Sequence, residues 1–196
     1  MRVVHRLVMI VAALAGLGIT WRALGDPYWP LVLFTVQSNL ILVAYNLWRP
    51  PSIAVKGAVT LYIAMTGLVW HFLLVRGANP FARVGSGGLG DFLLHYVTPA
   101  LAVVDWFAFD RERRTPRWTL AVAWLAYPAA YVVFALVRGA LLPAEAGRRY
   151  PYRFLDVDRY GYGGVALMVG ALALGFFVLG WALLWLRRPN PAGHPT

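Results

Sequence analysis

The sequence contains no cysteine, which excludes a disulfide bond and a thiolate nucleophile. Charged residues are scarce, since they make up 13% of the chain and only 8 of its 196 residues are acidic. What is present is strongly apolar: 60% of the residues are hydrophobic, and the mean hydropathy is +0.62. These values lie outside the range of soluble domains and indicate an integral membrane protein.

The few charges are mostly basic, with 18 Lys and Arg residues against the 8 acidic ones and a net charge of +10. On a soluble protein this excess would suggest a nucleic-acid partner. Here the basic residues fall almost entirely at helix ends and in loops, where they contact membrane lipid headgroups, so no nucleic-acid partner is expected. All but Lys56 are arginine. Together with abundant Ala and Gly, this bias suggests a bacterial protein of the inner (plasma) membrane.

Hydrophobic runs of membrane-spanning length account for most of the chain. We predict an all-α membrane protein, a six-transmembrane-helix bundle that forms a single transmembrane domain over residues 1–196. Ten of the basic residues fall on the side that carries both termini and eight on the other, so both termini are expected in the cytoplasm. The six helices are expected at about residues 4–23, 29–48, 57–75, 91–109, 118–138 and 163–186.

Polar residues inside two of these helices mark a candidate catalytic site. A hydroxyl and an imidazole suffice for nucleophilic catalysis, and hydrocarbon makes both costly to keep. Thr35 lies about six residues below the outer entry of its helix and His95 about four, so both belong to the same outer layer of the membrane. His71 and Arg138 reach this layer from two further helices. The sequence therefore predicts Thr35 and His95 as catalytic residues.

Helical spacing adds candidate substrate-binding residues. Asn39 follows Thr35 by four residues and so shares its face, with Ser38 beside it. Tyr131 and Arg138 likewise line one face of their helix. We expect Ser38, Asn39, His71, Tyr131 and Arg138 to contact a substrate, with acyl chains held by the apolar helix walls.

Each of these residues also has a structural interpretation. A threonine in a membrane helix usually bonds to a carbonyl one turn earlier, and a lone histidine is more often a hydrogen-bonding residue than a base. His71, next to Trp70, is also consistent with an interface anchor, and Arg138 with a side chain that reaches the headgroups.

Two further expectations concern charges and metals. Asp105 lies about 15 Å from His95 along a straight helix, too far to orient its imidazole, so no triad is predicted. A pairing of Asp105 with an arginine such as Arg49 or Arg111 is expected instead. No histidine pair has the spacing of a zinc site, so no metal and no cofactor are expected.

Three segments carry a family resemblance. Residues 34–40 (FTVQSNL), 94–99 (LHYVTP) with Asp105-Trp106, and 150–157 (YPYRFLDV) resemble the bacterial six-helix branch of the androgen-induced-gene-like family of integral membrane proteins. Animal members of that family are threonine hydrolases that cleave fatty acid esters of hydroxy fatty acids. The resemblance implies Thr35 as the nucleophile, His95 as the base and a fatty acyl ester as the substrate.

Alternative functions stay open at the level of the sequence. A transporter or a lipid-binding membrane protein would use His71, His95 and Arg138 as a proton or anion site, although the chain has no inverted repeat. A structural membrane protein without catalysis is a third interpretation. Hydrogen-bond reach between the Thr35 hydroxyl and a His95 nitrogen favours hydrolysis, whereas a separation beyond about 6 Å favours the alternatives.

Overall fold

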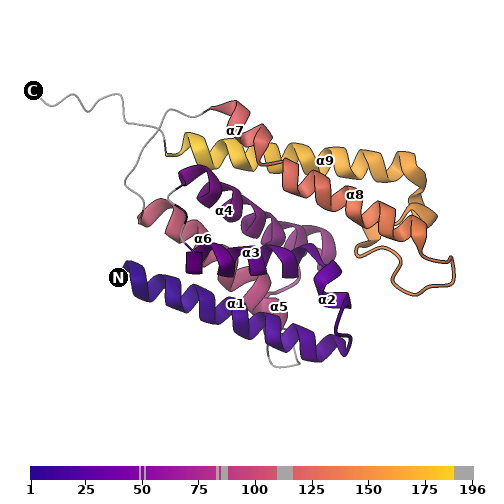
Figure 1. Cartoon of the computed structure of the whole chain (residues 1–196), viewed down its shortest axis with the longest axis horizontal. Helices are drawn as coiled ribbons and strands as arrows, with labels where there is room; N and C mark the ends of the chain where they lie inside the picture. The colour runs from indigo at the N-terminus through magenta and orange to yellow at the C-terminus, as the bar shows by residue number, and fades with distance from the viewer. Residues whose placement is uncertain (49, 51, 83, 85–87, 110–116, 188–196) are drawn as a thin grey trace, which may run out of the picture. The chain divides into compact units, whose positions relative to one another are not determined.

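The computed structural model describes residues 1–48, 50, 52–82, 84, 88–109 and 117–187, and within these ranges it contains helices and no strand. The predicted all-α fold is therefore confirmed. The helices, several of which are labelled in Figure 1, are α1 (Arg2–Leu24), α2 (Trp29–Val32), α3 (Phe34–Trp48), α4 (Ile53–Leu68), η1 (Val69–Leu74), α5 (Leu89–Phe92), η3 (Leu93–Val97), α6 (Thr98–Ala108), α7 (Trp118–Ala123), α8 (Ala126–Leu141), η4 (Arg153–Leu155) and α9 (Val157–Trp185).

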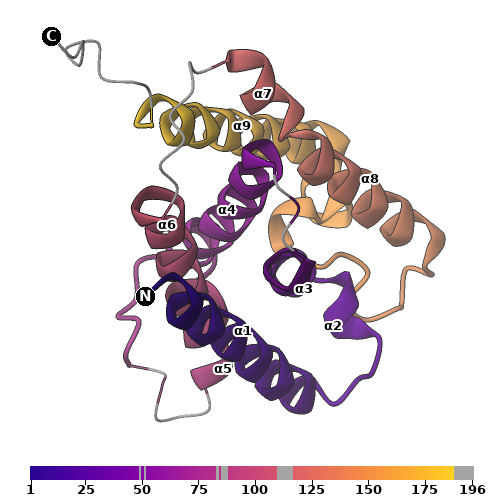
Figure 2. The same ribbon diagram turned by 60° about the vertical axis from the view of Figure 1, so that its left-hand side comes forward.

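The chain divides into two compact units, Met1–Arg117 with Ala182–Thr196, and Trp118–Trp181. In the first unit α4 packs against α3 and α6, and α1 packs against α3, α5, η3 and α6. Figure 2 shows α1, α3, α4, α5 and α6 from a second direction. Apolar side chains pack between these helices and form a hydrophobic core. The buried members of this core are Met9, Ala13, Leu42, Val43, Val59, Ile63 and Ala102.

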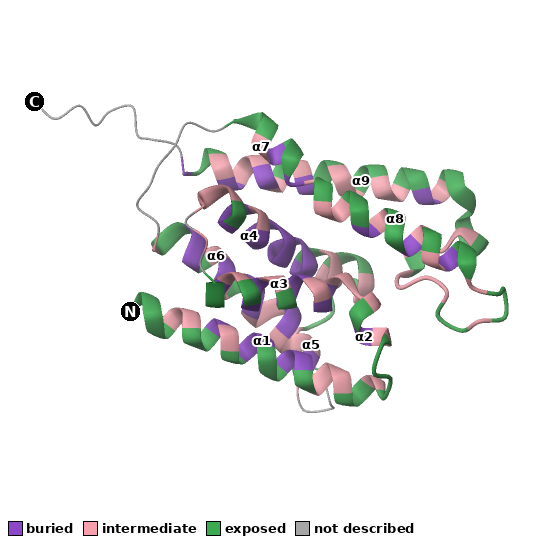
Figure 3. Cartoon of the chain, viewed as in Figure 1, coloured by how far each residue is buried: buried purple, intermediate pink, exposed green. Residues whose placement is uncertain are grey.

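Within the described residues, four helices are long and apolar enough to cross a membrane. They correspond to four of the six predicted spans, and their outward faces carry many exposed residues, drawn green in Figure 3. Exposed apolar side chains on long helices are expected where lipid is the solvent. An integral membrane protein is therefore the class that the fold supports. The four are Arg2–Leu24, Ile53–Leu74, Trp118–Leu141 and Val157–Trp185.

The predicted helix at 29–48 is broken near its start. Pro30 lies in the first turn of α2, and the backbone of Leu33 is extended (φ −82°, ψ 129°). A new helix, α3, then begins at Phe34, so Thr35 lies in its first turn rather than six residues into a continuous helix. The prediction of one uninterrupted helix here is wrong, and the break gives Thr35 a position at a helix N-terminus.

The predicted start of the helix at residue 57 is also wrong, because α4 begins at Ile53. The Ser52 side chain accepts a hydrogen bond from the backbone N–H of Val55 (3.3 Å) and caps the helix. Lys56 therefore lies in the first helical turn, where it is 4% exposed. The sequence placed this residue among the loop and interface cations, but its ammonium group is inside the protein.

A buried ion pair joins Lys56 to Asp105, which is 2% exposed. The Lys56 Nζ also donates to the backbone carbonyl of Asp105 at 3.0 Å, and Arg6 Nε lies 3.7 Å from Asp105 Oδ1. Arg49 and Arg111, the expected partners of Asp105, lie outside the described residues. The pairing links α1, α4 and α6 at one end of the first unit.

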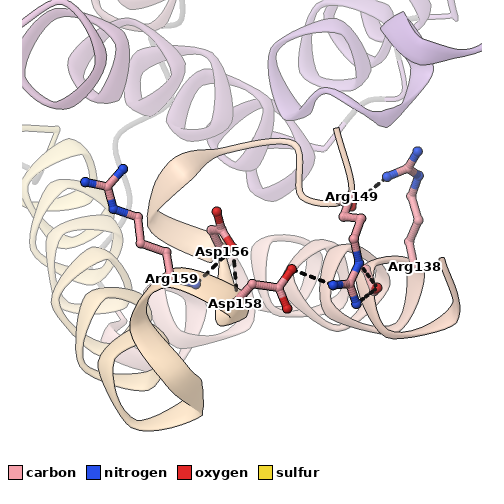
Figure 4. Close-up of polar contacts among 6 residues, drawn as sticks. Arg138, Arg149, Asp156, Asp158 and Arg159 are labelled. Atoms are coloured by element: carbon pink, nitrogen blue, oxygen red, sulfur yellow. Dashed lines mark hydrogen bonds and ion pairs between the residues drawn. The ribbon is translucent and has the colours of Figure 1, made fainter. Parts of the chain in front are cut away.

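In the second unit, arginine side chains hold the loop between α8 and α9. Arg149 donates from Nε and Nη2 to the Gly139 carbonyl (3.1 and 2.8 Å) and pairs with Asp158 (Figure 4). Asp156 accepts hydrogen bonds from the backbone N–H groups of Asp158 and Arg159, which caps the start of α9. The loop is thus fastened to the ends of both helices that it connects.

Candidate active site

Thr35 and His95, 60 residues apart in sequence, are hydrogen-bonded to each other. The Thr35 Oγ1 lies 3.1 Å from the His95 Nε2, and the two residues are 9% and 6% exposed. Thr35 comes from the first turn of α3 and His95 from the middle of η3. This distance satisfies the geometric requirement for a hydroxyl and its general base.

The second ring nitrogen of His95 fixes which tautomer is present. His95 Nδ1 lies 2.9 Å from the backbone carbonyl of Asp91, one turn earlier. A carbonyl oxygen only accepts, so Nδ1 carries the proton and the neutral ring keeps its lone pair on Nε2. Nε2 therefore accepts from the Thr35 hydroxyl, as a general base must.

The segments η1 and η3 have the wider geometry of a π-helix, and η3 carries His95. Pro99 has no N–H to donate to the carbonyl of His95, so the regular hydrogen-bond ladder cannot continue across this point. The Thr98 N–H bonds instead to the Leu93 carbonyl, five residues back. π-helical segments are frequent at functional sites because they redirect side chains.

A glycine lets α4 approach η3 at the site. A Cβ added at Gly67 would lie 2.6 Å from the His95 carbonyl oxygen and 3.1 Å from Pro99 Cγ. Both contacts are too close for a methyl group, so only glycine fits here without displacement of the backbone that carries His95.

The Gly67→Ala variant is expected to lose about 1–3 kcal/mol of folding free energy, because the added methyl group must push α4 and η3 apart. The loss is measured by denaturant titration in detergent micelles. Gly18→Ala is the matched control, since a Cβ at Gly18 meets nothing within 4 Å. Equal stability of the two variants would contradict the close packing of these helices.

A buried network of hydrogen bonds holds the backbone carbonyl of Thr35. Asn39 Nδ2 donates to the Thr35 carbonyl (2.9 Å), and the Thr98 hydroxyl lies 2.9 Å from Asn39 Oδ1 and 3.1 Å from the Leu94 carbonyl. Asn39 therefore braces the helical turn that carries Thr35. Ser38, which is 0% exposed, has a hydroxyl with no hydrogen-bond partner within the described residues.

His71 reaches the same region through Tyr96. Its Nδ1 lies 3.1 Å from the Tyr96 hydroxyl, and its ring meets the Tyr96 ring edge-on. Trp70, its neighbour in η1, stacks on the His95 ring with centroids 4.0 Å apart. The structure thus brings four predicted site residues, Thr35, His95, Asn39 and His71, into one set of contacts, and it adds Trp70, Thr98 and Tyr96. Trp70 is not among the site residues predicted from the sequence.

The other two candidates, Tyr131 and Arg138, belong to the second unit, so their contact with a substrate at Thr35 stays a prediction. Arg138 Nη1 donates to the backbone carbonyls of Arg148 (3.0 Å) and Arg149 (2.7 Å), a structural role in the loop (Figure 4). Burial, followed by nearby carboxylates, raises the pKa of the Tyr150 hydroxyl in this loop above its ordinary value.

Metal chemistry has no candidate residues in the part of the chain that the structure describes. No three His, Cys, Asp or Glu side chains there form a group that could hold an ion.

Comparisons with protein-family models, with curated proteins and with solved structures find no match to this chain. The function must therefore be argued from the site itself.

Proposed function

We propose that the protein is a membrane-embedded hydrolase of fatty acyl esters, with Thr35 as the nucleophile and His95 as the general base. The observation that carries this proposal is the 3.1 Å contact between the Thr35 hydroxyl and His95 Nε2, in a ring whose Nδ1 lies 2.9 Å from the Asp91 carbonyl. The resemblance of three segments to the bacterial six-helix branch of the androgen-induced-gene-like family supports the same chemistry. No cofactor is needed for acyl transfer of this kind.

The proposed setting is the bacterial inner membrane. Residues 29–48 and 91–109 add two spans to the four long apolar helices, which gives six spans in one transmembrane domain, with both termini in the cytoplasm. The catalytic pair then lies in the outer half of the bilayer, where a lipid ester can diffuse to it from the side. Apolar helix walls hold its acyl chain.

The reaction proceeds in two acyl-transfer steps. His95 Nε2 takes the proton of Thr35 Oγ1, which attacks the ester carbonyl carbon, and the protonated imidazole then delivers that proton to the departing alkoxide. The products of this step are an alcohol and an acyl-threonine ester. A water molecule, deprotonated by His95, attacks the acyl-threonine carbonyl, and the proton returns to Thr35 as the carboxylic acid leaves.

Stabilisation of the oxyanion is assigned to groups near the start of α3. The Ser38 hydroxyl is a hydrogen-bond donor whose capacity no described residue uses, and the N-terminal turn of α3 carries partial positive charge. Asn39 is engaged at both ends of its amide and acts as a brace. His71 is proposed to contact the polar part of the substrate.

The test is chemical labelling of the purified protein in lipid nanodiscs with an alkyl fluorophosphonate. Phosphonylation of the Thr35 hydroxyl, located by fragmentation of the labelled peptide, is the expected result. Hydrolysis of p-nitrophenyl octanoate is followed in the same preparation. Labelling at other hydroxyls but not at Thr35, without ester hydrolysis, would instead favour a transporter or a lipid-binding protein that uses the histidines as a proton site.

A further inference from the structure

The imidazole of His95 has a contact on its ring face in addition to the hydrogen bonds at its two nitrogens. The Trp70 indole lies over it with a centroid separation of 4.0 Å and an angle of only 16° between the ring planes. Trp70 comes from η1 and His95 from η3, so the stack joins the two π-helical segments. A near-parallel stack restricts rotation of the imidazole about its bond to the Cβ, because rotation would drive the ring edge into the indole.

The edge contacts require one particular ring orientation. Nδ1 must face the Asp91 carbonyl at 2.9 Å while Nε2 faces the Thr35 hydroxyl at 3.1 Å. A half-turn of the ring would replace both nitrogens by carbon atoms and lose both hydrogen bonds. Asp105, the intramembrane carboxylate of the same helical run, is bound by Lys56 and gives the ring no support. A neutral backbone carbonyl thus takes the place that a carboxylate occupies in a catalytic triad.

Trp70 is itself kept in place by its surroundings. His71, the next residue of η1, has its Nδ1 3.1 Å from the hydroxyl of Tyr96 in η3. Gly67, one turn earlier along the same helical run, meets the backbone of His95 directly. These contacts hold η1, the segment that carries the indole, against η3.

We propose that Trp70 is a positioning residue for His95: its indole face holds the imidazole in the orientation that directs Nε2 at Thr35. For its catalytic consequence the proposal rests on the proposed hydrolase function. The ring gains a positive charge when it takes the Thr35 proton, and an indole face stabilises a cation that lies over it. Trp70 therefore supports both the orientation of the base and the charged form that it adopts.

The test combines a spectroscopic signature with kinetics. In the wild type, ¹⁵N spectra of histidine-labelled protein in nanodiscs are expected to show His95, assigned by its absence in His95→Ala, as a single tautomer protonated at Nδ1. Trp70→Leu and Trp70→Met are expected to give averaged tautomers, whereas Trp70→Phe restores the single form because an aromatic face is retained. Phe72→Leu is the matched control, since Phe72 contacts the His71 ring edge-on from the same segment.

Kinetics with p-nitrophenyl octanoate separate positioning from folding. Trp70→Leu is expected to lower kcat roughly 10- to 100-fold with little change in KM, and Trp70→Phe to recover most of it. An unchanged His95 tautomer in both non-aromatic variants would overturn the positioning role. If the tautomer depends on Trp70 but the wild type has no esterase activity, the proposed hydrolase function fails and the positioning role stands.

Discussion

The Thr35→Ala variant is expected to lose hydrolysis of acyl esters by roughly a thousandfold or more, because no other hydroxyl lies in reach of the base in the described site. His95→Ala should produce a loss of similar size, and the double variant should be no worse than either single one. Residues that act as one unit are strongly non-additive in this way. Initial rates with p-nitrophenyl octanoate provide the measurement.

Two variants make this result specific. Thr35→Ser keeps a hydroxyl at the same position and should retain activity within about tenfold. Thr60→Ala removes another buried threonine hydroxyl, which donates to the Lys56 carbonyl at 2.9 Å, and should leave the rate unchanged. Full activity in Thr35→Ala, or additive losses in the double variant, would exclude the pair as a catalytic unit.

The Asp105→Ala variant is expected to lose about 3–5 kcal/mol of folding free energy, since it leaves the Lys56 ammonium and the nearby Arg6 guanidinium without a buried counter-ion. Lys56→Met combined with Asp105→Asn removes both charges and should recover most of this loss. Replacing a buried pair together is often close to neutral, whereas removing one partner is not. Denaturant titration of the detergent-solubilised protein measures these differences.

An exposed ion pair supplies the comparison. Asp158 pairs with Arg149 in the loop, but its side chain is 54% exposed, so Asp158→Ala should cost at most about 1 kcal/mol. If Asp105→Ala were as mild as this loop variant, the Lys56–Asp105 pair would not lie in a low-dielectric interior. Such a result would also contradict the buried position of Lys56 in α4.

The sequence predicted the helical class and named Thr35 and His95 because polar groups in apolar helices are conspicuous. It predicted their common depth from residue counts alone, although the helix that carries Thr35 is broken at Leu33. Their hydrogen bond is a contact between helices far apart in sequence, and no periodicity within one helix specifies it. The catalytic role of the pair stays a prediction.

Other features depended on backbone geometry that a residue pattern does not encode. Trp70, in the π-helical segment η1, stacks on His95, and this contact between two segments is specified by the residue pattern of neither. A helix that starts at residue 57 puts Lys56 at the interface, whereas the Ser52 cap begins α4 at Ile53 and puts Lys56 in its first turn. Serine is a preferred N-cap residue, so Ser52 is the feature of the sequence that indicates the earlier start.

Lys56 lies in the continuous helical run formed by α4 and η1, and His95 in the run formed by α5, η3 and α6. These two runs contact each other at two separate points. Lys56 meets Asp105 at one end, and Gly67 meets His95 at the other, so the runs are antiparallel partners with two fixed points about 15 Å apart. Sliding one run along the other by a single turn, about 5.4 Å, would break both contacts at once. The ion pair therefore sets the register of the helices, and the alignment of the imidazole with Thr35 depends on a charge pair that never touches a substrate.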